Sequence, residues 1–247
     1  MKISQRRNRT FVYKAINSGV GKAIHTYDMI AAGEKLAVGL SGGKDSLTLC
    51  WILKNRLKHI PVDYDLTASY IDPGFENGFA DRLAAYCDDI GIQLIVEYTD
   101  HGLVAHSAEN RENPCFLCSR LRRKRLFELA EDIGARKLAL GHHKDDIIET
   151  LFLNMFYAGE ISTMAPRQEF FKGAMTIIRP LAFLDEDIIR KFSELMEFPV
   201  FETACPSAKQ SKRYAVKKML TDLYRTNRKI RGNIFRALHH VKQDYLL

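Results

Sequence analysis

The stretch that decides the fold is LAVGLSGGKDS, residues 36–46, in which an apolar run leads into a glycine turn. The run 36–40 predicts a buried strand, and a helical pattern starts at residue 46 and continues to about residue 58. Gly42 and Gly43 permit positive φ and close backbone approach, so successive N–H groups can form an anion-binding nest at the helix N-terminus. The stretch therefore predicts a loop that cradles phosphate.

The polar side chains of this turn fit a nucleotide, although the turn is not a Walker A loop. Lys44 is followed by Asp45 instead of Ser or Thr, and Val38 occupies the place of the first glycine. An aspartate beside a phosphate nest is suited to hold Mg²⁺ against the pyrophosphate, and Lys44 is suited to neutralise phosphate charge. The turn is similar to the PP-loop of ATP pyrophosphatases, and we predict that it binds ATP through Ser41, Gly42, Gly43, Lys44, Asp45 and Ser46.

Short β-rich runs alternate with amphipathic helical patterns along the rest of the chain. This alternation predicts an α/β fold with a doubly wound, mostly parallel five-stranded sheet and ligand sites at the carboxyl ends of the strands. We expect a basic helical arm at 1–34, the nucleotide-binding domain at 35–205 and a basic helical segment at 206–247. The predicted strands are 36–40, 66–71, 93–98, 137–140 and 176–178, and the predicted helices are 46–58, 79–90, 119–133, 145–157 and 185–197.

A second polar motif, GHHKDD at residues 141–146, follows the fourth predicted strand and opens a helix. We predict that Gly141 and His142 lie beside the nucleotide, since no third ligand at zinc spacing accompanies the histidines. Asp145 and Asp146 can bind a second face of Mg²⁺–ATP or polarise the acceptor. Acids in the first turn also suit an ordinary helix N-terminus. Asp146 and Glu149 are three apart and are expected to share a helical face.

The five cysteines fall into two groups. Cys50 and Cys87 lie on the apolar faces of predicted helices and are expected to be core thiols. Cys115 and Cys118 form a C-x-x-C pair at a helix N-terminus, and five basic residues within the next seven positions predict that the pair is biased toward thiolate. Together with Cys205, which lies in a downstream loop, they suit an iron–sulfur cluster with one open iron. Zinc or a redox pair are the alternatives.

The net charge of +7 is concentrated at the C-terminal end. From residue 209 to residue 247, eleven Lys and Arg stand against two acids, so this segment carries +9 and the remainder carries −2. Tyr214, Tyr224 and Phe235 are interleaved with the basic residues. This pattern is typical of a surface that binds RNA, and a solvated helical face is the alternative.

The N-terminal segment is basic and polar, and no apolar stretch follows it. This pattern argues against a secretory signal, and no window of the sequence is long and apolar enough to span a membrane. We therefore expect a cytoplasmic protein with no membrane partner. The basic residues of this segment are Lys2, Arg6, Arg7 and Arg9.

As an ordered set, these motifs resemble the tRNA 2-thiocytidine synthetase (TtcA-like) family, a branch of the PP-loop ATP pyrophosphatases. The resemblance rests on residues 41–46, CFLCSRLRR at 115–123, GHHKDDIIETLFLN at 141–154, RPL at 179–181 and the segment after Cys205. It implies an AMP-forming tRNA sulfurtransferase that depends on ATP and Mg²⁺. The enzyme would adenylate the C2 carbonyl of an anticodon-loop cytidine, position 32, and replace the oxygen by sulfur to give 2-thiocytidine.

The resemblance also implies the ligands and partners of the protein. A 4Fe-4S cluster would be held by Cys115, Cys118 and Cys205. The chain departs from the family at Glu202, where a further cysteine is common, and this leaves a clean set of three. A cysteine desulfurase would supply sulfur to a tRNA-bound enzyme, and a homodimer is the expected assembly.

Catalytic roles are expected for residues from three of these motifs. Arg122 and Arg123 are placed to neutralise phosphate or the developing anion, with contact to the RNA backbone or an exposed helix face as the alternatives. Asp45 is expected to hold Mg²⁺. The expected catalytic residues are Lys44, Asp45, Arg122, Asp145 and Asp146.

Two other functions compete with this interpretation. One is a PP-loop sulfur-transfer or desulfurating enzyme that acts on another tRNA base or on a small molecule. The other is a non-catalytic nucleotide-binding iron–sulfur module. Lys44, Asp45 and the pair Asp145 and Asp146 argue against the second alternative, because a pure sensor has no need of a magnesium–pyrophosphate site.

Overall fold

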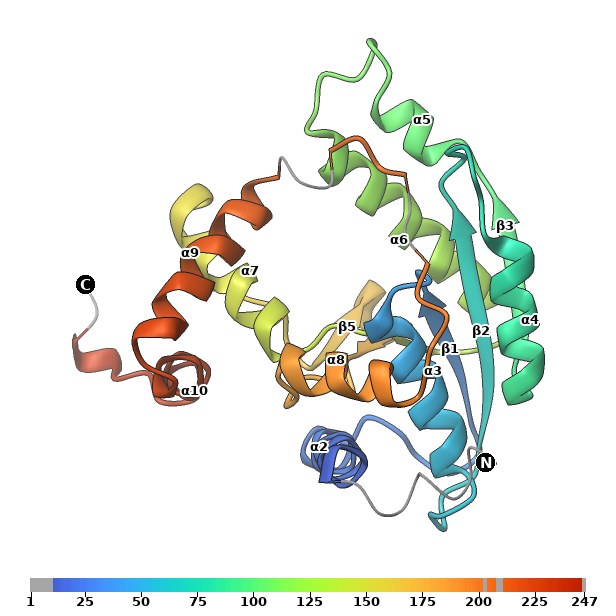
Figure 1. Cartoon of the computed structure of the whole chain (residues 1–247), viewed down its shortest axis with the longest axis horizontal. Helices are drawn as coiled ribbons and strands as arrows, with labels where there is room; N and C mark the ends of the chain where they lie inside the picture. Colours follow the sequence, from blue (N-terminus) through green and yellow to red (C-terminus); the bar gives the residue numbers. More distant parts are fainter. Residues whose placement is uncertain (1–10, 202–203, 208–210, 246–247) are drawn as a thin grey trace.

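The computed structural model describes residues 11–201, 204–207 and 211–245, and within them the chain forms a six-stranded sheet (Figure 1). The strand order is β3-β2-β1-β4-β6-β5. Five strands are parallel, and β5 runs antiparallel to β6 at one edge. The strands are β1 (Glu34–Leu40), β2 (Tyr64–Asp72), β3 (Gln93–Tyr98), β4 (Lys137–Ala139), β5 (Arg167–Phe170) and β6 (Met175–Ile178).

The predicted α/β class and mostly parallel sheet are confirmed, but the predicted number of strands is wrong. The additional strand, β5, has the sequence RQEF and lacks an apolar run. It forms because a tight connection at residues 171–173 folds it back onto β6. Backbone pairing with β6 therefore defines this strand, and Phe170 is its one apolar side chain that packs against a core.

Helices cover both faces of the sheet. One core joins β1 and β2 to α2, α3, α4 and α8, with Ile16, Leu47, Leu83 and Phe192 fully buried. A second core packs α6 on the opposite face through Leu126. The helices are α2 (Phe11–Thr26), α3 (Lys44–Arg56), α4 (Ala80–Ile90), α5 (His101–Ala105), α6 (Pro114–Asp132), α7 (Lys144–Tyr157), α8 (Glu186–Leu195), α9 (Lys212–Thr226) and α10 (Lys229–Ala237).

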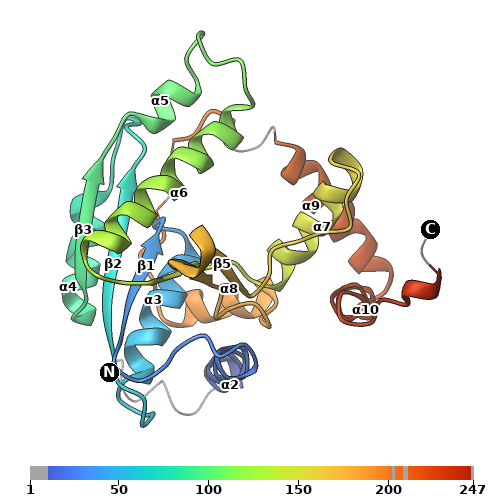
Figure 2. The ribbon, with the colours of Figure 1, turned by 180° about the vertical axis from the view of Figure 1, so that it is seen from behind.

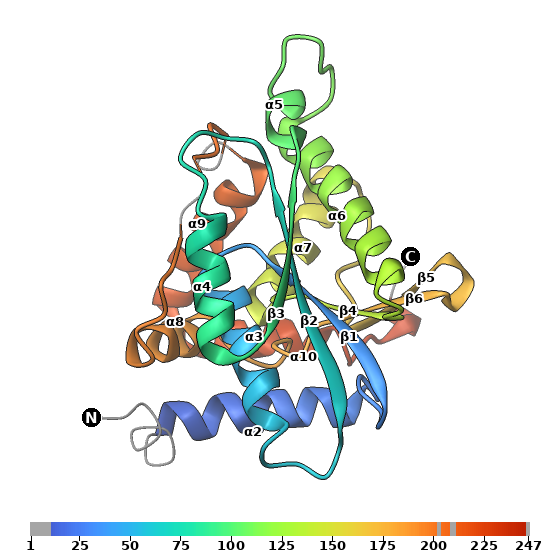
Figure 3. The ribbon, with the colours of Figure 1, turned by 90° about the vertical axis from the view of Figure 1, so that its right-hand side faces the viewer.

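The helical additions lie at two different ends of the sheet. Helix α2 crosses below the sheet where β1 begins (Figure 3). Helices α7, α9 and α10 form a third small core around Ile148, Val216 and Leu220. Seen from the front and from behind, this group stands across from α6 (Figures 1 and 2). Helix α6 and the group of α7, α9 and α10 therefore flank the edge at which the parallel strands end.

Helix α6 starts five residues earlier than predicted, at Pro114. The Asn113 side chain accepts hydrogen bonds from the N–H groups of Cys115 and Phe116 at 3.0 and 3.3 Å, which caps the helix. Proline at the first helical position is typical of a helix start. Both cysteines of the C-x-x-C pair therefore lie in the first turns of α6.

Several sequence predictions fall on residues outside the described ranges. They concern the basic N-terminal residues Lys2, Arg6, Arg7 and Arg9, the departure at Glu202, and residues 208–210 of the segment after Cys205. Among the described residues, no helix combines the length and the apolar character needed to cross a membrane.

Candidate functional site

The glycine turn connects the buried end of β1 to α3. Gly42 adopts a φ of +75°, and a Cβ there would lie 2.5 Å from the Phe79 ring and 3.1 Å from Phe201 Cβ. The Phe201 N–H donates a 3.0 Å hydrogen bond to the Gly42 carbonyl. Glycine is therefore required here both by the backbone conformation and by the two aromatic side chains that close over the turn.

Hydrogen bonds from Ser46 fix the shape of the turn. Its hydroxyl oxygen accepts from the Ser41 N–H at 3.1 Å and donates to the Gly43 carbonyl at 3.0 Å. Gly43 is the N-cap of α3 and offers no side chain to the first N–H groups. Those donors, together with the helix dipole, form the positive end that favours a phosphate.

The two charged residues of the turn are held in a carboxylate cluster. Lys44 Nζ lies 3.2 Å from Asp45 Oδ2 and 3.0 Å from Glu186 Oε1. Burial lowers the pKa of Lys44, but the two carboxylates outweigh it and the pKa is raised. Asp45 Oδ1 is buried without a hydrogen-bond partner among the described residues. An unsatisfied carboxylate oxygen of this kind fits the oxygen ligand that Mg²⁺ prefers.

The second motif packs directly on the first. A Cβ at Gly141 would lie 3.0 Å from both Asp45 C and Ser46 N, so only glycine allows this approach. His142 follows at the end of β4, and its Nδ1 accepts a 3.3 Å hydrogen bond from Arg179 Nε. The structure therefore brings Gly141 and His142 beside the glycine turn.

Asp145 and Asp146 make contacts that organise the start of α7. Asp146 accepts a 2.9 Å hydrogen bond from the His143 N–H. Asp145 accepts one from the Glu186 N–H at 2.7 Å and pairs with Arg231 Nε at 3.1 Å, while burial raises its pKa. These contacts are those of a helix N-terminus joined to α8 and α10. A direct catalytic role of the two acids stays a prediction.

Asp146 and Glu149 face the same side of α7, as their spacing predicts. The Arg213 Nη1 of α9 lies 3.6 Å from Asp146 Oδ1 and 3.0 Å from Glu149 Oε2. Burial raises the pKa of Glu149, with Asp146 adding to the effect and Arg213 opposing it. This face therefore anchors the basic segment to the motif at 141–146.

The three cysteines of interest gather at the N-terminus of α6. The Ser207 hydroxyl oxygen lies 3.2 Å from Cys115 Sγ and 3.5 Å from Cys205 Sγ, so these sulfurs cannot be further apart than the two distances combined. Cys118 lies close enough to both to feel their charge. Three partly exposed thiols are chemically suited to iron. Within the described residues, however, no three His, Cys, Asp or Glu side chains are gathered tightly enough to hold a metal ion.

The predicted thiolate bias is wrong for Cys118. Burial raises its pKa, and the charge of Arg122 opposes this without overcoming it. The neighbouring basic side chains pair elsewhere, since Arg120 contacts Glu112 at 3.2 Å and Arg125 contacts Glu97 at 2.5 Å. Arg122 therefore acts on this thiol, whereas Arg120 and Arg125 are held by carboxylates.

Cys50 and Cys87 are fully buried in the first core, as predicted for core thiols. The two side chains are hydrogen-bonded to each other, and this bond with burial raises the pKa of Cys50 well above its usual range. Cys50 lies in α3 and Cys87 in α4, and both helices pack against β1 and β2 in this core.

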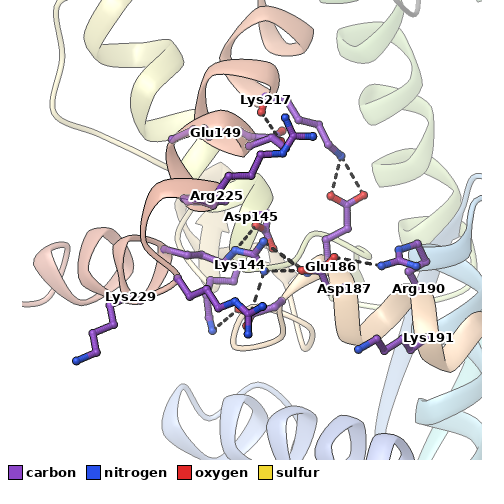
Figure 4. A pocket seen from close by; sticks show the side chains of 17 residues that line it. Lys144, Asp145, Glu149, Glu186, Asp187, Arg190, Lys191, Lys217, Arg225 and Lys229 are labelled. Atoms are coloured by element: carbon purple, nitrogen blue, oxygen red, sulfur yellow. Dashed lines mark hydrogen bonds and ion pairs between the residues drawn. The ribbon is translucent and has the colours of Figure 1, made fainter.

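Some residues of the site carry no signal in the sequence. Ser207 also bonds His106 Nε2 at 3.0 Å, although the two are 101 positions apart. Glu186 of α8 contacts both Lys44 and Lys217, and these lysines lower its pKa to about 2 despite burial. Figure 4 shows Glu186 reaching toward Lys217 in a cavity of about 1010 Å³ between α7, α8, α9 and α10. Such contacts depend on tertiary packing, which periodicity does not encode.

The PP-loop domain family matches residues 13–236. The chain belongs to the PP-loop family. The tRNA-cytidine(32) 2-sulfurtransferase of Geobacter sulfurreducens is 39% identical over 238 residues, which cover 95% of this chain and 93% of that protein. The enzyme of the same name from Pseudomonas syringae pv. tomato is 40% identical over 244 residues, 97% and 88% of the two chains. The resemblance inferred from the motifs is confirmed.

Solved structures agree with this PP-loop assignment. The U34-tRNA thiolase NcsA from Methanococcus maripaludis, solved with its 4Fe-4S cluster, has a TM-score of 0.77 and 25% identity, covering 96% of this chain and 80% of that one. The NH3-dependent NAD synthetase of Campylobacter jejuni has a TM-score of 0.51 at 13% identity, covering 99% and 95%. The second likeness shows the fold alone.

Proposed function

We propose that this chain is an ATP-dependent tRNA sulfurtransferase that converts an anticodon-loop cytidine, at position 32, to 2-thiocytidine. The observation that carries the proposal is that residues 201, 205 and 207 connect the glycine turn to the cysteines. Phe201 bonds the Gly42 carbonyl, and four positions later Cys205 shares the Ser207 hydroxyl with Cys115. Because an extended residue spans roughly 3.5 Å, Cys205 lies within about 15 Å of residue 201 and hence close to the glycine turn.

Arg122 of α6 is a second indication that the cysteines lie close to the glycine turn. Its charge acts on Cys118 and also on His142, which adjoins the glycine turn. One bound base can therefore lie between the nucleotide and the thiols. The names of the relatives, which act on cytidine 32 of tRNA, and the PP-loop itself favour this substrate over a small molecule.

The chemistry proceeds in two displacements. The C2 oxygen of the cytidine attacks the α-phosphorus of ATP, pyrophosphate leaves, and the oxygen becomes part of an AMP ester. Sulfur at the reduction level of sulfide then attacks C2, and AMP leaves with that oxygen. Activation is needed because a pyrimidine carbonyl oxygen is a poor leaving group.

The residues of the turn bind and neutralise the leaving pyrophosphate. The free N–H groups at the start of α3 and the Lys44 ammonium offset its charge. Asp45 Oδ1 is the atom we assign to Mg²⁺, which is held against the phosphates. Lys44 must exchange Glu186 for phosphate when ATP binds. Asp145 and Asp146 position the loop at 141–143, and Arg122 neutralises the anion that develops on the base.

Cys115, Cys118 and Cys205 are the residues that would hold a 4Fe-4S cluster. Bound there, the cluster would supply an open iron site for the sulfur to be transferred. The proposal includes a cysteine desulfurase as the sulfur donor and a homodimer as the assembly, since both are expected from the family. The basic helices α9 and α10 are the expected contact to tRNA.

A reconstitution experiment tests the function. Protein reconstituted anaerobically with iron and sulfide is incubated with ATP, Mg²⁺, sulfide and unmodified tRNA, and nucleosides are analysed by mass spectrometry. We expect 2-thiocytidine from the wild type, and none from Cys205→Ala, which should still bind ATP. Turnover of a small acceptor but of no RNA would contradict the tRNA assignment. ATP binding without AMP release would indicate a non-catalytic module.

A further inference from the structure

Arg179 carries a buried positive charge that makes no close ion pair among the described residues, although the charge of Asp146 acts on it. Its side chain is only 4% exposed and makes no ion pair with a described carboxylate. Its guanidinium donates to the Ala165 carbonyl, to Gln168 Oε1 at 3.4 Å and to His142 Nδ1 at 3.3 Å. Burial lowers the pKa of Arg179 only to about 10, so the group is charged at neutral pH. A buried charge without a direct ion-pair partner is costly, which indicates that an anion belongs nearby.

The hydrogen bond from Arg179 fixes the state of His142. A guanidinium can only donate, so His142 Nδ1 must accept, and the proton of the neutral ring must be on Nε2. Burial lowers the pKa of His142 to about 3, and the charges of Arg179, Arg213 and Arg122 outweigh the opposing effect of Asp146. The imidazole is therefore a neutral donor through Nε2–H at working pH. The ring is half-buried, and no described group bonds Nε2.

The strand order places His142 and Arg179 beside the glycine turn, where the nucleotide is proposed to bind. β4 lies between β1 and β6, and the Leu140 N–H bonds the Ile178 carbonyl at 3.0 Å, which sets His142 beside Arg179. On the other side, Gly141 packs against the backbone of Asp45 and Ser46. The glycine turn, the imidazole and the buried guanidinium thus follow one another along the carboxyl edge of three adjacent strands.

We propose that Arg179 and His142 form an oxyanion site for the nucleotide. Arg179 is a positioning residue that holds the imidazole as the Nε2–H donor, and His142 donates this hydrogen to a non-bridging oxygen of the α-phosphate. The inference rests on the proposed function in requiring ATP on the glycine turn. A neutral donor backed by a buried cation stabilises negative charge on the oxygens of the attacked phosphate without transferring its proton to them.

Imidazole ¹⁵N NMR on the whole protein tests the inference without tRNA. In the wild type we expect His142, assigned by its absence in His142→Gln, to show a bare Nδ1 and a protonated Nε2 from pH 6 to 8. Addition of ATP with Mg²⁺ should shift the Nε2 resonance. A proton on Nδ1, or an Nε2 resonance that ATP leaves unmoved, would overturn the proposal. This outcome does not depend on whether any RNA is thiolated.

Kinetics of AMP formation separate positioning from folding. Arg179→Gln should lower kcat by at least about tenfold with little change in the Kd for ATP, and its His142 should show both tautomers. Arg179→Lys keeps the charge but lacks the planar guanidinium group, so its kcat should lie between those of the wild type and Arg179→Gln. The matched control is Arg167→Gln, which removes an exposed arginine of β5 that pairs with Glu169. Wild-type kcat in a folded Arg179→Gln protein would overturn the positioning role.

Discussion

At the scale of the residue, the environment of Asp45 is the clearest sign of a cation-binding group. One carboxylate oxygen bonds Lys44, whereas the other is buried without a hydrogen-bond partner among the described residues. His143 Nε2 is 3.7 Å from that oxygen, too far for a hydrogen bond. An unsatisfied charged atom opposes folding, and its retention beside a phosphate nest is explained by a cation that binds with the nucleotide.

Asp45→Asn should therefore separate function from stability. The amide keeps the shape of the side chain but removes the charge that binds Mg²⁺, so we expect AMP formation to fall by about 100-fold or more. The free energy of unfolding should stay within about 1 kcal/mol of the wild type. Asp65→Asn, at an exposed position of β2, is the control. AMP formation at the wild-type rate would exclude Asp45 as the metal ligand.

The neutral, half-buried His142 predicts how the free energy of unfolding depends on pH. Its pKa is about 3 in the folded protein, against about 6.5 when unfolded, so only the unfolded state takes up this proton between these values. Stability from this group is complete above pH 6.5 and falls by up to about 1.4 kcal/mol per pH unit below it. Urea unfolding should be measured between pH 4 and 8. The free energy of unfolding should depend less steeply on pH in His142→Gln than in the wild type. Parallel curves would mean that folding does not lower the pKa of His142.

At the scale of the element, contact between the start of α7 and the start of α3 builds the nucleotide site. This contact has no room for a side chain at Gly141. Gly141→Ala should push the two apart, with a loss of about 1–3 kcal/mol in the free energy of unfolding and weaker ATP binding. Gly232→Ala in α10, where a Cβ meets no atom within 4 Å, should be neutral or stabilising. Calorimetry measures both the free energy of unfolding and the affinity for ATP. Equal effects of the two substitutions would contradict this account.

The sequence was sufficient for those features that are continuous along the chain. The glycine turn, the GHHKDD motif and the C-x-x-C pair each lie within a few positions, so local chemistry identified them. β5 was not predictable, because RQEF has no apolar alternation and is a strand only through its pairing with β6. The contacts of Arg179 with His142 and of Ser207 with His106 depend on strand order and loop packing. No local pattern encodes those.

At the scale of the whole molecule, charge is arranged on the arm formed by α9 and α10. Arg213 and Lys217 on the inner side of α9 pair with Glu149 and Glu186 and so connect the arm to the nucleotide site. Among the described residues of the arm, Lys218, Arg228 and Lys229 are exposed and make no ion pair with a carboxylate. We infer that the inner residues position the arm, and that the exposed ones are available to phosphates of the RNA.

Neutralising exposed basic residues of this arm should weaken RNA binding without affecting adenylation of the bound base. The substitutions are Lys218→Gln, Arg228→Gln and Lys229→Gln. The apparent Kd for tRNA should rise, and the slope of log K against log salt should become shallower by up to about 2–3, because each lost phosphate contact changes it by roughly 0.7–0.9. The value of kcat at saturating tRNA should be unchanged.

A control with the same change in net charge removes lysines that lie outside α9 and α10. These are Lys14→Gln, Lys35→Gln and Lys58→Gln, all at exposed positions. The control should leave the salt dependence of tRNA binding as it is in the wild type. An equal change in slope for both triple variants would mean that overall charge, and not this arm, governs binding.

The central claim is that the oxygen activated at the glycine turn is the oxygen that sulfur replaces at the cysteines. Isotope tracing tests this most directly. The reconstituted protein is given ATP, Mg²⁺, sulfide and tRNA that carries ¹⁸O at C2 of cytidine 32, and AMP and nucleosides are analysed by mass spectrometry. We predict one ¹⁸O-labelled AMP for each 2-thiocytidine formed, with no label in pyrophosphate. Formation of 2-thiocytidine with unlabelled AMP would contradict the account.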